Sequence, residues 1–353
     1  MTTDLTRALQ ERVVAAAADR TPLAIMGGGS KGFYGRASTG TPIGISGHCG
    51  IVAYEPKELV ITARAGTSLR EVEETLAAQG QMLPFEPPHF GSGATIGGMV
   101  ATGLSGPRRP YTGSVRDYVL GVRMLNGQGE QLRFGGEVMK NVAGYDLSRL
   151  MTGSLGILGI ILEVSLKVLP KPEQELTLLR ECDAGTAVEF MNTTAAKPLP
   201  VSGACHDGTV LRLRLSGTSR AVAAASRELG GSEDGAGERF WRDLRELAHP
   251  FLQPAADPLW RVAVRSTTPP LGMGEEWIDW GGAQRWLRTD SDSETVREAA
   301  TAAGGHALVF SGGDRGSAVF HPLSPALALI HSRLKQAFDP QRLFNPGRLY
   351  ATL

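Results

Sequence analysis

Apolar residues at helical or strand spacing predict the elements of the first half of the chain. Apolar positions three or four residues apart predict a helix over residues 5–18, with Leu5, Leu9, Val13 and Ala16 on one face. The run Pro22 to Met26 predicts a buried strand, and the alternation over residues 59–65 predicts a strand with one buried face. Two longer apolar stretches, 118–125 and 160–169, predict further strands.

Polar and glycine positions indicate where these elements begin and end. Ser68 and Glu71 have the spacing of a capping box, so we expect a helix to start there and to end near Gly80. Asn126-Gly127 predicts a hairpin between the strand over 118–125 and a return strand over 130–134. Residues 84–117 show no sustained period, and so long an irregular segment in a compact domain is usually functional.

From residue 171 onward the pattern changes to strands alternating with helices and few glycines. We expect strands over 175–182, 210–215, 260–264 and 307–310, and helices over 186–194, 219–229, 238–247 and 294–303. Residues 324–338 predict an amphipathic helix capped by Ser324, with Leu327, Ile330, Leu334 and Phe338 on one face. This pattern predicts an α+β second domain.

Composition narrows the class of protein. The 353 residues carry 36 basic and 36 acidic side chains, so no charge excess points to nucleic acid or to an anionic membrane surface. The longest apolar run, Leu155 to Val164, is far shorter than the ~20 residues of a membrane span, and no signal peptide precedes the first helix. Three cysteines without a C-x-x-C pair predict reduced thiols in a cytoplasmic protein, with no iron–sulfur cluster in this chain.

The most distinctive motif is the glycine-rich loop Gly27-Gly28-Gly29-Ser30-Lys31-Gly32-Phe33, which follows the first predicted strand. Bare glycine backbone can approach a ligand closely and turn its N–H groups toward an anion such as a pyrophosphate. The loop matches G-x-G-x-x-G, but residues 33–42 do not continue as a helix. The only acidic residue near the place where a ribose would be held is Glu55, which precedes Pro56, and both features argue against a Rossmann site. A glycine-rich turn without a ligand is the alternative.

Further glycine segments follow in a fixed order. They are Arg64 to Leu69, Gly91 to Ala101, Tyr111 to Asp117 and Gly153 to Ile161. In order and spacing, residues 1–170 resemble the FAD-binding domain of the vanillyl-alcohol-oxidase and p-cresol-methylhydroxylase type. The tail Asn345-Pro346-Gly347 resembles that of D-lactate and related 2-hydroxy-acid dehydrogenases of the same superfamily.

Over nearly its whole length the chain is similar to the FAD-binding E subunits of bacterial glycolate oxidases. The stretches Lys140 to Leu147, Ser105 to Pro110 and Phe338 to Tyr350 carry this likeness. The resemblance implies an α+β fold with a two-subdomain FAD-binding domain over 1–170 and a smaller α+β cap domain over 171–322. Residues 323–353 would form a C-terminal helix and tail that pack back on the FAD domain.

The resemblance also implies which residues hold the cofactor. The loop Gly27 to Phe33 would wrap the FAD pyrophosphate, and the loop from Gly93 to Gly103 would line the flavin and ribityl chain. Gly113 and Ser114 would approach the flavin from the other side, and the loop at Gly153 would meet the adenine end. The implied cofactor-binding residues are Gly27, Gly28, Gly29, Ser30, Lys31, Gly32, Phe33, Gly93, Ala94, Thr95, Gly97, Gly98, Ala101, Thr102, Gly103, Gly113, Ser114, Gly153, Gly156, Ile160 and Asn345. The first loop contains no His or Cys, so we expect noncovalent FAD.

Catalytic residues are harder to identify. Relatives often use clustered histidines, sometimes with a metal, but no two of the seven histidines here lie within four residues of each other, so we expect no metal site. His306, just before a predicted strand, is the candidate base. Arg108, Arg109 and Arg116 are candidates for holding a carboxylate; surface charge pairing is the equal alternative.

The resemblance implies oxidation of glycolate to glyoxylate, with electrons passing through flavin toward iron–sulfur centres and quinone. The implied partners are a paralogous FAD-containing D subunit, which would oxidise the substrate, and an iron–sulfur F subunit. We expect a cytoplasmic protein that reaches the inner face of the membrane only through these partners. A self-sufficient FAD dehydrogenase of another hydroxy acid or sugar acid, and a non-catalytic assembly subunit, remain alternatives.

Overall fold

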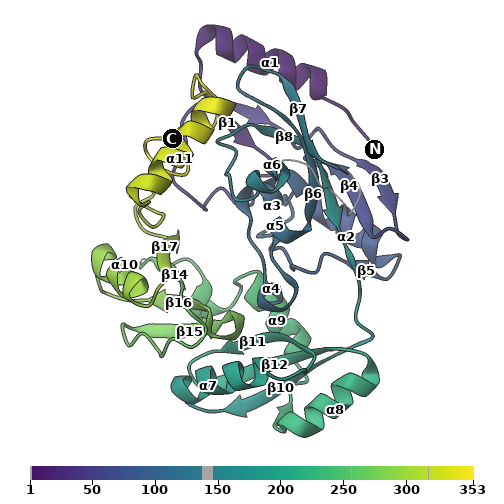
Figure 1. The fold of residues 1–353 in the computed structure, drawn as a ribbon, viewed down its shortest axis with the longest axis vertical. Helices are drawn as coiled ribbons and strands as arrows, with labels where there is room; N and C mark the ends of the chain where they lie inside the picture. The colour runs from purple at the N-terminus through teal and green to yellow at the C-terminus, as the bar shows by residue number, and fades with distance from the viewer. Residues whose placement is uncertain (1, 137–145, 256, 317) are drawn as a thin grey trace.

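The computed structural model describes residues 2–136, 146–255, 257–316 and 318–353. Residues 140–145 of the stretch Lys140 to Leu147 lie outside this range. The chain forms two lobes, with the elements up to β9 and the C-terminal helix in one and β10 to β17 in the other (Figure 1).

The first lobe is built on a five-stranded antiparallel sheet of order β3-β4-β8-β6-β7. Its strands are β3 (Ile51–Glu55), β4 (Val60–Arg64), β6 (Val119–Leu125), β7 (Gln131–Gly135) and β8 (Ile160–Lys167). The predicted hairpin between β6 and β7 is confirmed, with Leu125 opposite Gln131. A separate parallel pair, β1 (Leu23–Met26) with β2 (Thr41–Gly44), lies beside α1 (Thr6–Asp19). A two-residue pair, β5 (Gln81–Met82) with β9 (Leu169–Pro170), completes the strands of this lobe.

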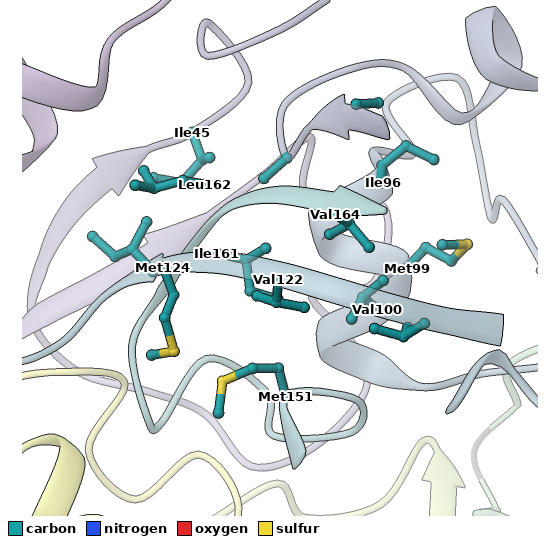
Figure 2. Close-up of a cluster of buried hydrophobic side chains, with 14 of the residues drawn as sticks. Ile45, Ile96, Met99, Val100, Val122, Met124, Met151, Ile161, Leu162 and Val164 are labelled. Carbon is teal, nitrogen blue, oxygen red and sulfur yellow. The ribbon is translucent and has the colours of Figure 1, made fainter. Parts of the chain in front are cut away.

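Residues 84–117 are more regular than expected. They contain α3 (Ile96–Thr102) and two single turns of helix, α4 (Arg109–Thr112) and α5 (Val115–Tyr118). Ile96, Met99 and Val100 of α3 are fully buried and pack near β6 and β8, where Figure 2 shows them beside Val122 and Val164. The sequence hid α3 because Gly97 and Gly98, which disfavour a helix, lie in its first turn; tertiary packing overrides that preference. A further turn, α6 (Leu147–Leu150), is capped by Asp146, whose side chain accepts a hydrogen bond from the Arg149 amide.

The predicted helix after Ser68 is present as α2 (Leu69–Ala77), with Leu69, Val72 and Leu76 buried. Ser68 is its N-cap residue, but its side chain makes no capping hydrogen bond, so the predicted capping box is wrong. Such a box forms instead at α5, where Ser114 and Asp117 cap each other's backbone.

The second lobe is an antiparallel sheet of eight strands in the order β13-β10-β12-β11-β15-β16-β14-β17. Its elements are β10 (Gln174–Glu181), α7 (Ala184–Ala195), β11 (Val201–His206), β12 (Val210–Gly217), α8 (Ser219–Leu229), β13 (Ser232–Glu233), α9 (Gly237–Arg245), β14 (Leu259–Ala263), β15 (Glu275–Asp279), β16 (Gln284–Arg288), α10 (Ser293–Ala302) and β17 (His306–Ser311). Two 3-10 turns, Pro250–Leu252 and Trp280–Gly282, connect them. Four of these strands, β10, β12, β14 and β17, and all four helices were predicted from the sequence, whereas β11, β13, β15 and β16 were not.

The two faces of this sheet have different neighbours. One face carries Trp286, Leu308 and Phe310, which form one apolar cluster with Tyr34 and Leu104 of the first lobe. The other face carries Trp260, Val262 and Leu287, which pack against Val296 and Ala300 of α10. The side of the sheet with Phe310 therefore lies against the first lobe.

The C-terminal helix α11 (Pro325–Phe338) runs along the edge of the first lobe (Figure 1). Ser324 caps it as predicted, and Phe338 packs against Phe134 of β7 with 6.1 Å between ring centroids. Leu327 and Ile330, expected on the packed face, are 48% and 51% exposed, because only the last turns of the helix dock on the lobe. Among the described residues, no helix has the length and apolar character that crossing a membrane requires.

Candidate functional site

The loop Gly27 to Phe33 leaves β1 as a series of turns and does not open a helix, as expected. Within the described part of the chain, the backbone N–H groups of Gly28, Gly29 and Ser30 donate no hydrogen bond to another residue. Gly29 has a φ of 75° and open space where a Cβ would lie. The loop therefore offers successive unused donors on a backbone that only glycine adopts easily.

The second glycine loop packs directly against the first. A Cβ at Gly28 would lie 1.6 Å from the carbonyl oxygen of Gly93, and one at Gly27 would lie 2.7 Å from Oγ1 of Thr95. Among the described residues, the amides of Gly91, Ser92 and Gly93 also donate no hydrogen bond. Two runs of unused N–H donors thus lie on adjoining loops. The glycines of these loops allow the two backbones to touch and also allow a ligand to reach the N–H groups.

The third glycine loop is joined to both the first loop and the C-terminal tail by Asn345. Its side chain accepts a hydrogen bond from the Ile25 amide at 2.7 Å and donates one to the Leu155 carbonyl at 2.7 Å. Gly153 donates its amide to the Val100 carbonyl of α3 at 3.0 Å. Asn345 therefore fixes the position of the strand that enters the first loop relative to the loop at Gly153.

The other expected cofactor residues occupy varied places. Gly97 approaches Ala65, whose Cβ would lie 2.6 Å from an added Cβ, so this glycine serves helix packing. Ile160 is fully buried in β8 and pairs with Leu125. The remaining expected residues lie in or beside α3, in the turns next to it or at the third loop: Ala94, Thr95, Gly98, Ala101, Thr102, Gly103, Gly113, Ser114 and Gly156.

Lys31 places a buried positive charge in the first loop. Its side chain is almost fully buried, and its Nζ donates to the His89 carbonyl at 3.2 Å and lies 5.7 Å from the centroid of the Phe90 ring. Burial lowers the pKa of Lys31 to about 8, against the opposing charge of Glu246. The Glu246 carboxylate itself accepts the amides of His89 and Phe90, at 3.0 and 2.8 Å. Lys31 therefore has no close counter-ion among the described residues.

Aromatic rings join the end of the first loop to the second lobe. Phe33 lies 5.3 Å from Phe90 and 5.7 Å from Phe310, and Tyr34 lies 5.4 Å from Phe310, measured between ring centroids. These contacts bring the glycine loops and the sheet face of β17 to the same junction between the lobes.

Of the four candidate residues for substrate binding and catalysis, the structure brings His306 and Arg109 to this junction. Burial and the positive charges of Arg261, His321 and Arg109 lower the pKa of His306. Burial and Arg261 likewise lower the pKa of Arg109, against the opposing charge of Asp117. Arg261 was not predicted as a site residue from the sequence, although it lies within the strand predicted over residues 260–264. Arg116 is exposed on α5 and makes no recorded contact with this group among the described residues.

Arg108 is a structural residue, contrary to its proposed role in holding a substrate carboxylate. Its Nε lies 3.3 Å from Glu86, and its guanidinium also contacts Glu175. Arg214 of β12 meets the same Glu86 carboxylate through two nitrogens, each at 2.9 Å. Because Glu86 and Arg108 belong to the first lobe and Arg214 and Glu175 to the second, this network joins the lobes.

A buried carboxyl group, Asp279, lies at the same junction. It accepts hydrogen bonds from the Trp280 amide at 2.7 Å and from Gln284 at 3.2 Å. Burial raises the pKa of Asp279 to about 7 despite these donors. Trp280 in turn donates its indole N–H to the Gly106 carbonyl of the first lobe at 3.1 Å. No cluster of metal-ligating side chains forms in the part of the chain that the structure describes.

Known proteins match both the sequence and the fold. A family model described as an FAD binding domain matches residues 4–135. The chain is 52% identical over 351 residues to the glycolate oxidase subunit GlcE of Escherichia coli (strain K12), with 99% of both proteins covered. It is 35% identical over 155 residues to the glycolate oxidase subunit GlcD of Bacillus subtilis (strain 168), covering 43% of this chain and 33% of that protein.

The fold also has solved counterparts. An alkyldihydroxyacetonephosphate synthase structure superposes with a TM-score of 0.66 at 16% identity, covering 96% of this chain and 74% of the other. At this identity the likeness concerns the fold alone, an α+β protein whose FAD-binding domain is N-terminal here. The match to GlcE extends over the full length of both proteins, and the chain therefore belongs to the family of the glycolate oxidase subunit GlcE.

Proposed function

We propose that this protein is the FAD-binding subunit of a glycolate oxidase and takes part in the oxidation of glycolate to glyoxylate. One observation carries the proposal beyond family membership: two touching glycine loops present successive backbone N–H groups that no described residue uses. Gly28, Gly29, Gly91, Ser92 and Gly93 are exposed, so their free N–H groups are accessible to an incoming anion, and such a run suits the oxygens of a pyrophosphate. The buried charge of Lys31 adds the cation that a doubly charged anion favours.

The fit to FAD is therefore good, and we assign the first two loops to the pyrophosphate and the flavin side. The loop at Gly153 and Asn345 would hold the adenine end. Bound FAD would accept a hydride equivalent from an alcohol carbon. We infer noncovalent binding, since the loops carry no His or Cys and the nearby His89 ring already contacts Glu73 at 2.9 Å.

We further propose that residues 1–170 form the FAD domain of the p-cresol-methylhydroxylase type, that 171–322 form the cap and that 323–353 return to the FAD domain. The buried Lys335 of α11 supports the last point, since it donates to the Ile157 carbonyl at 2.7 Å. In the complex, a paralogous FAD-containing D subunit would oxidise glycolate, and an iron–sulfur F subunit would receive the electrons. This chain would then relay electrons at the cytoplasmic face of the membrane.

A second candidate function is favoured by one observation. Arg109, Arg261 and His306 gather at the junction between the lobes, where Arg109 stacks on Trp280 and Arg261 donates to the Tyr34 hydroxyl, as a substrate site would require. The chain would then oxidise a hydroxy acid by itself.

Co-purification with the D and F subunits tests these functions together. The flavin spectrum would be recorded before and after glycolate, with and without this chain. We expect the complex to contain more than one FAD per D subunit and to lose electron transfer to quinone when this chain is omitted. A fully active D–F pair with unchanged flavin content would contradict the proposal. Full glycolate oxidation by the isolated chain would instead establish the second candidate.

A further inference from the structure

We propose that Arg109, Arg261 and His306 form a binding site for the carboxylate of a small 2-hydroxy acid, at the junction between the two lobes. The choice of a 2-hydroxy acid as the ligand rests on the proposed function, because a glycolate oxidase acts on this class of substrate. It gives this chain a ligand site of its own, separate from the glycine loops.

The register of the second-lobe sheet places two of the three groups together. Ala263 of β14 lies opposite His306 of β17, and Arg261 lies opposite Leu308. Side chains two residues apart on a strand share a face, so Arg261 and His306 are diagonal neighbours. That face is the one that meets the first lobe, and Arg261 donates from Nη2 to the Tyr34 hydroxyl at 3.2 Å.

The third group comes from the first lobe and is held by the second. The Arg109 guanidinium lies 4.3 Å from the centroid of the Trp280 ring. Trp280 is fixed by its hydrogen bond to the Gly106 carbonyl and adopts a φ of 54°, which is strained for so large a side chain. Such strain persists where surrounding contacts enforce it and is common at ligand sites. Trp280 thus acts as a positioning residue for Arg109.

The charges at this site are not balanced by the protein. Among the described residues, Arg109 and Arg261 form no ion pair, whereas Arg108 and Arg214 nearby are each paired with Glu86. The two carboxylates in the neighbourhood are engaged elsewhere. Asp117 accepts the amide and hydroxyl of Ser114, at 2.7 and 2.8 Å, and Asp279 is held by Trp280 and Gln284.

The chemistry of the three groups selects a hydroxy acid. Guanidinium groups bind carboxylates through paired N–H donors, and stacking on aromatic rings fixes their planes. Burial and the nearby positive charges lower the pKa of His306 below its usual value, which favours the neutral imidazole at pH 7. A neutral imidazole offers a nitrogen that can accept a hydrogen bond from the hydroxyl next to the carboxylate.

Calorimetric titration of the FAD-loaded full chain with oxalate, a dicarboxylate without an oxidisable alcohol, tests the site. Intrinsic tryptophan fluorescence, to which Trp280 contributes, provides a second signal. We expect saturable binding at one site per chain. Arg109→Gln and Arg261→Gln should each raise the Kd about tenfold or more, since each removes charged hydrogen bonds. Arg70→Gln, which changes an exposed arginine of α2, should leave the Kd unchanged. Circular dichroism and the flavin spectrum confirm that each variant is folded and loaded.

Three results would overturn the proposal while leaving FAD binding intact. They are the absence of saturable oxalate binding by the loaded wild-type chain, an equal loss in Arg70→Gln, and binding of sulfate as tightly as oxalate. The proposal would also be overturned if Arg261→Gln loses FAD but keeps its oxalate affinity when FAD is in excess, because Arg261 would then belong to the cofactor site. Failure of the wild-type chain to take up FAD would instead count against the proposed function.

Discussion

Gly28 and Gly93 lie backbone against backbone, so that a Cβ at Gly28 would come within 1.6 Å of the Gly93 carbonyl oxygen. The contact locks together two loops whose unused amides we assign to one cofactor. Gly28→Ala should force the loops apart, destabilise the protein by ~1–3 kcal/mol as overpacking does, and weaken FAD binding at least about tenfold.

Gly44→Ala is the matched control, because a Cβ at Gly44 of β2 meets no atom within 4 Å. Thermal unfolding and titration with FAD, followed by flavin fluorescence, measure both effects. Equal FAD affinity of the two variants would show that the loop contact does not shape the cofactor site.

The buried charge of Lys31 predicts a pH dependence of FAD binding. Its folded pKa is lowered to about 8, so in the FAD-free protein the ammonium form is lost as pH rises through that value. If the charge attracts the pyrophosphate, FAD affinity should fall between pH 7 and pH 9, and Lys31→Met should bind FAD weakly with little change over this range. Lys57→Met, at an exposed position, should retain the wild-type profile. A wild-type profile in Lys31→Met would exclude the ammonium group from the site.

The network around Glu86 predicts how the lobes are held. Glu86→Ala would leave Arg108 and Arg214, both almost fully buried, without their shared carboxylate. Removing one partner of a buried ion pair costs roughly 3–5 kcal/mol. Urea unfolding should therefore show a large loss for Glu86→Ala and almost none for Glu74→Ala, at an exposed position of α2. Similar midpoints for the two variants would mean that the network adds nothing to stability.

Asp279 predicts a stability change of defined sign. Its pKa is raised from 3.8 to about 7, so between these values the folded protein holds a proton that the unfolded chain has released. Stability from this group is therefore present at low pH and is lost as pH rises toward 7, by on the order of 1 kcal/mol per pH unit. The free energy of unfolding of wild type minus that of Asp279→Asn should fall from pH 5 to pH 8. A constant difference would show that Asp279 does not titrate in this range.

Helices and strands were predicted correctly where a hydrophobic period or a turn motif within the segment itself specifies them. The period of residues 5–18 and the turn at Asn126-Gly127 each match an element of the structure. Helix α3 was missed because it contains Gly97, which close contact with Ala65 requires and which no local rule of helix propensity anticipates. Strands β15 and β16 were missed because each has only two adjacent apolar residues flanked by polar and charged ones, so neither shows the alternation typical of a strand.

The candidate site was predictable only in part for the same reason. Glycine loops are visible as motifs, so their order could be compared with a family. The position of Arg261 depends on the register between β14 and β17, and that of Trp280 on a left-handed backbone conformation. Neither feature can be recognised from the sequence. Arg108 looked like a ligand because its partner Glu86 lies 22 residues away in the sequence.

Release of the cofactor is the most direct test of the central claim that the glycine loops bind FAD without a covalent bond. The purified chain, loaded with FAD and freed of excess, would be precipitated with acid and both fractions measured for flavin absorbance. If the binding is noncovalent, we expect close to one FAD per chain, all of it in the supernatant. Flavin retained in the pellet, or a folded chain that takes up no FAD, would contradict it.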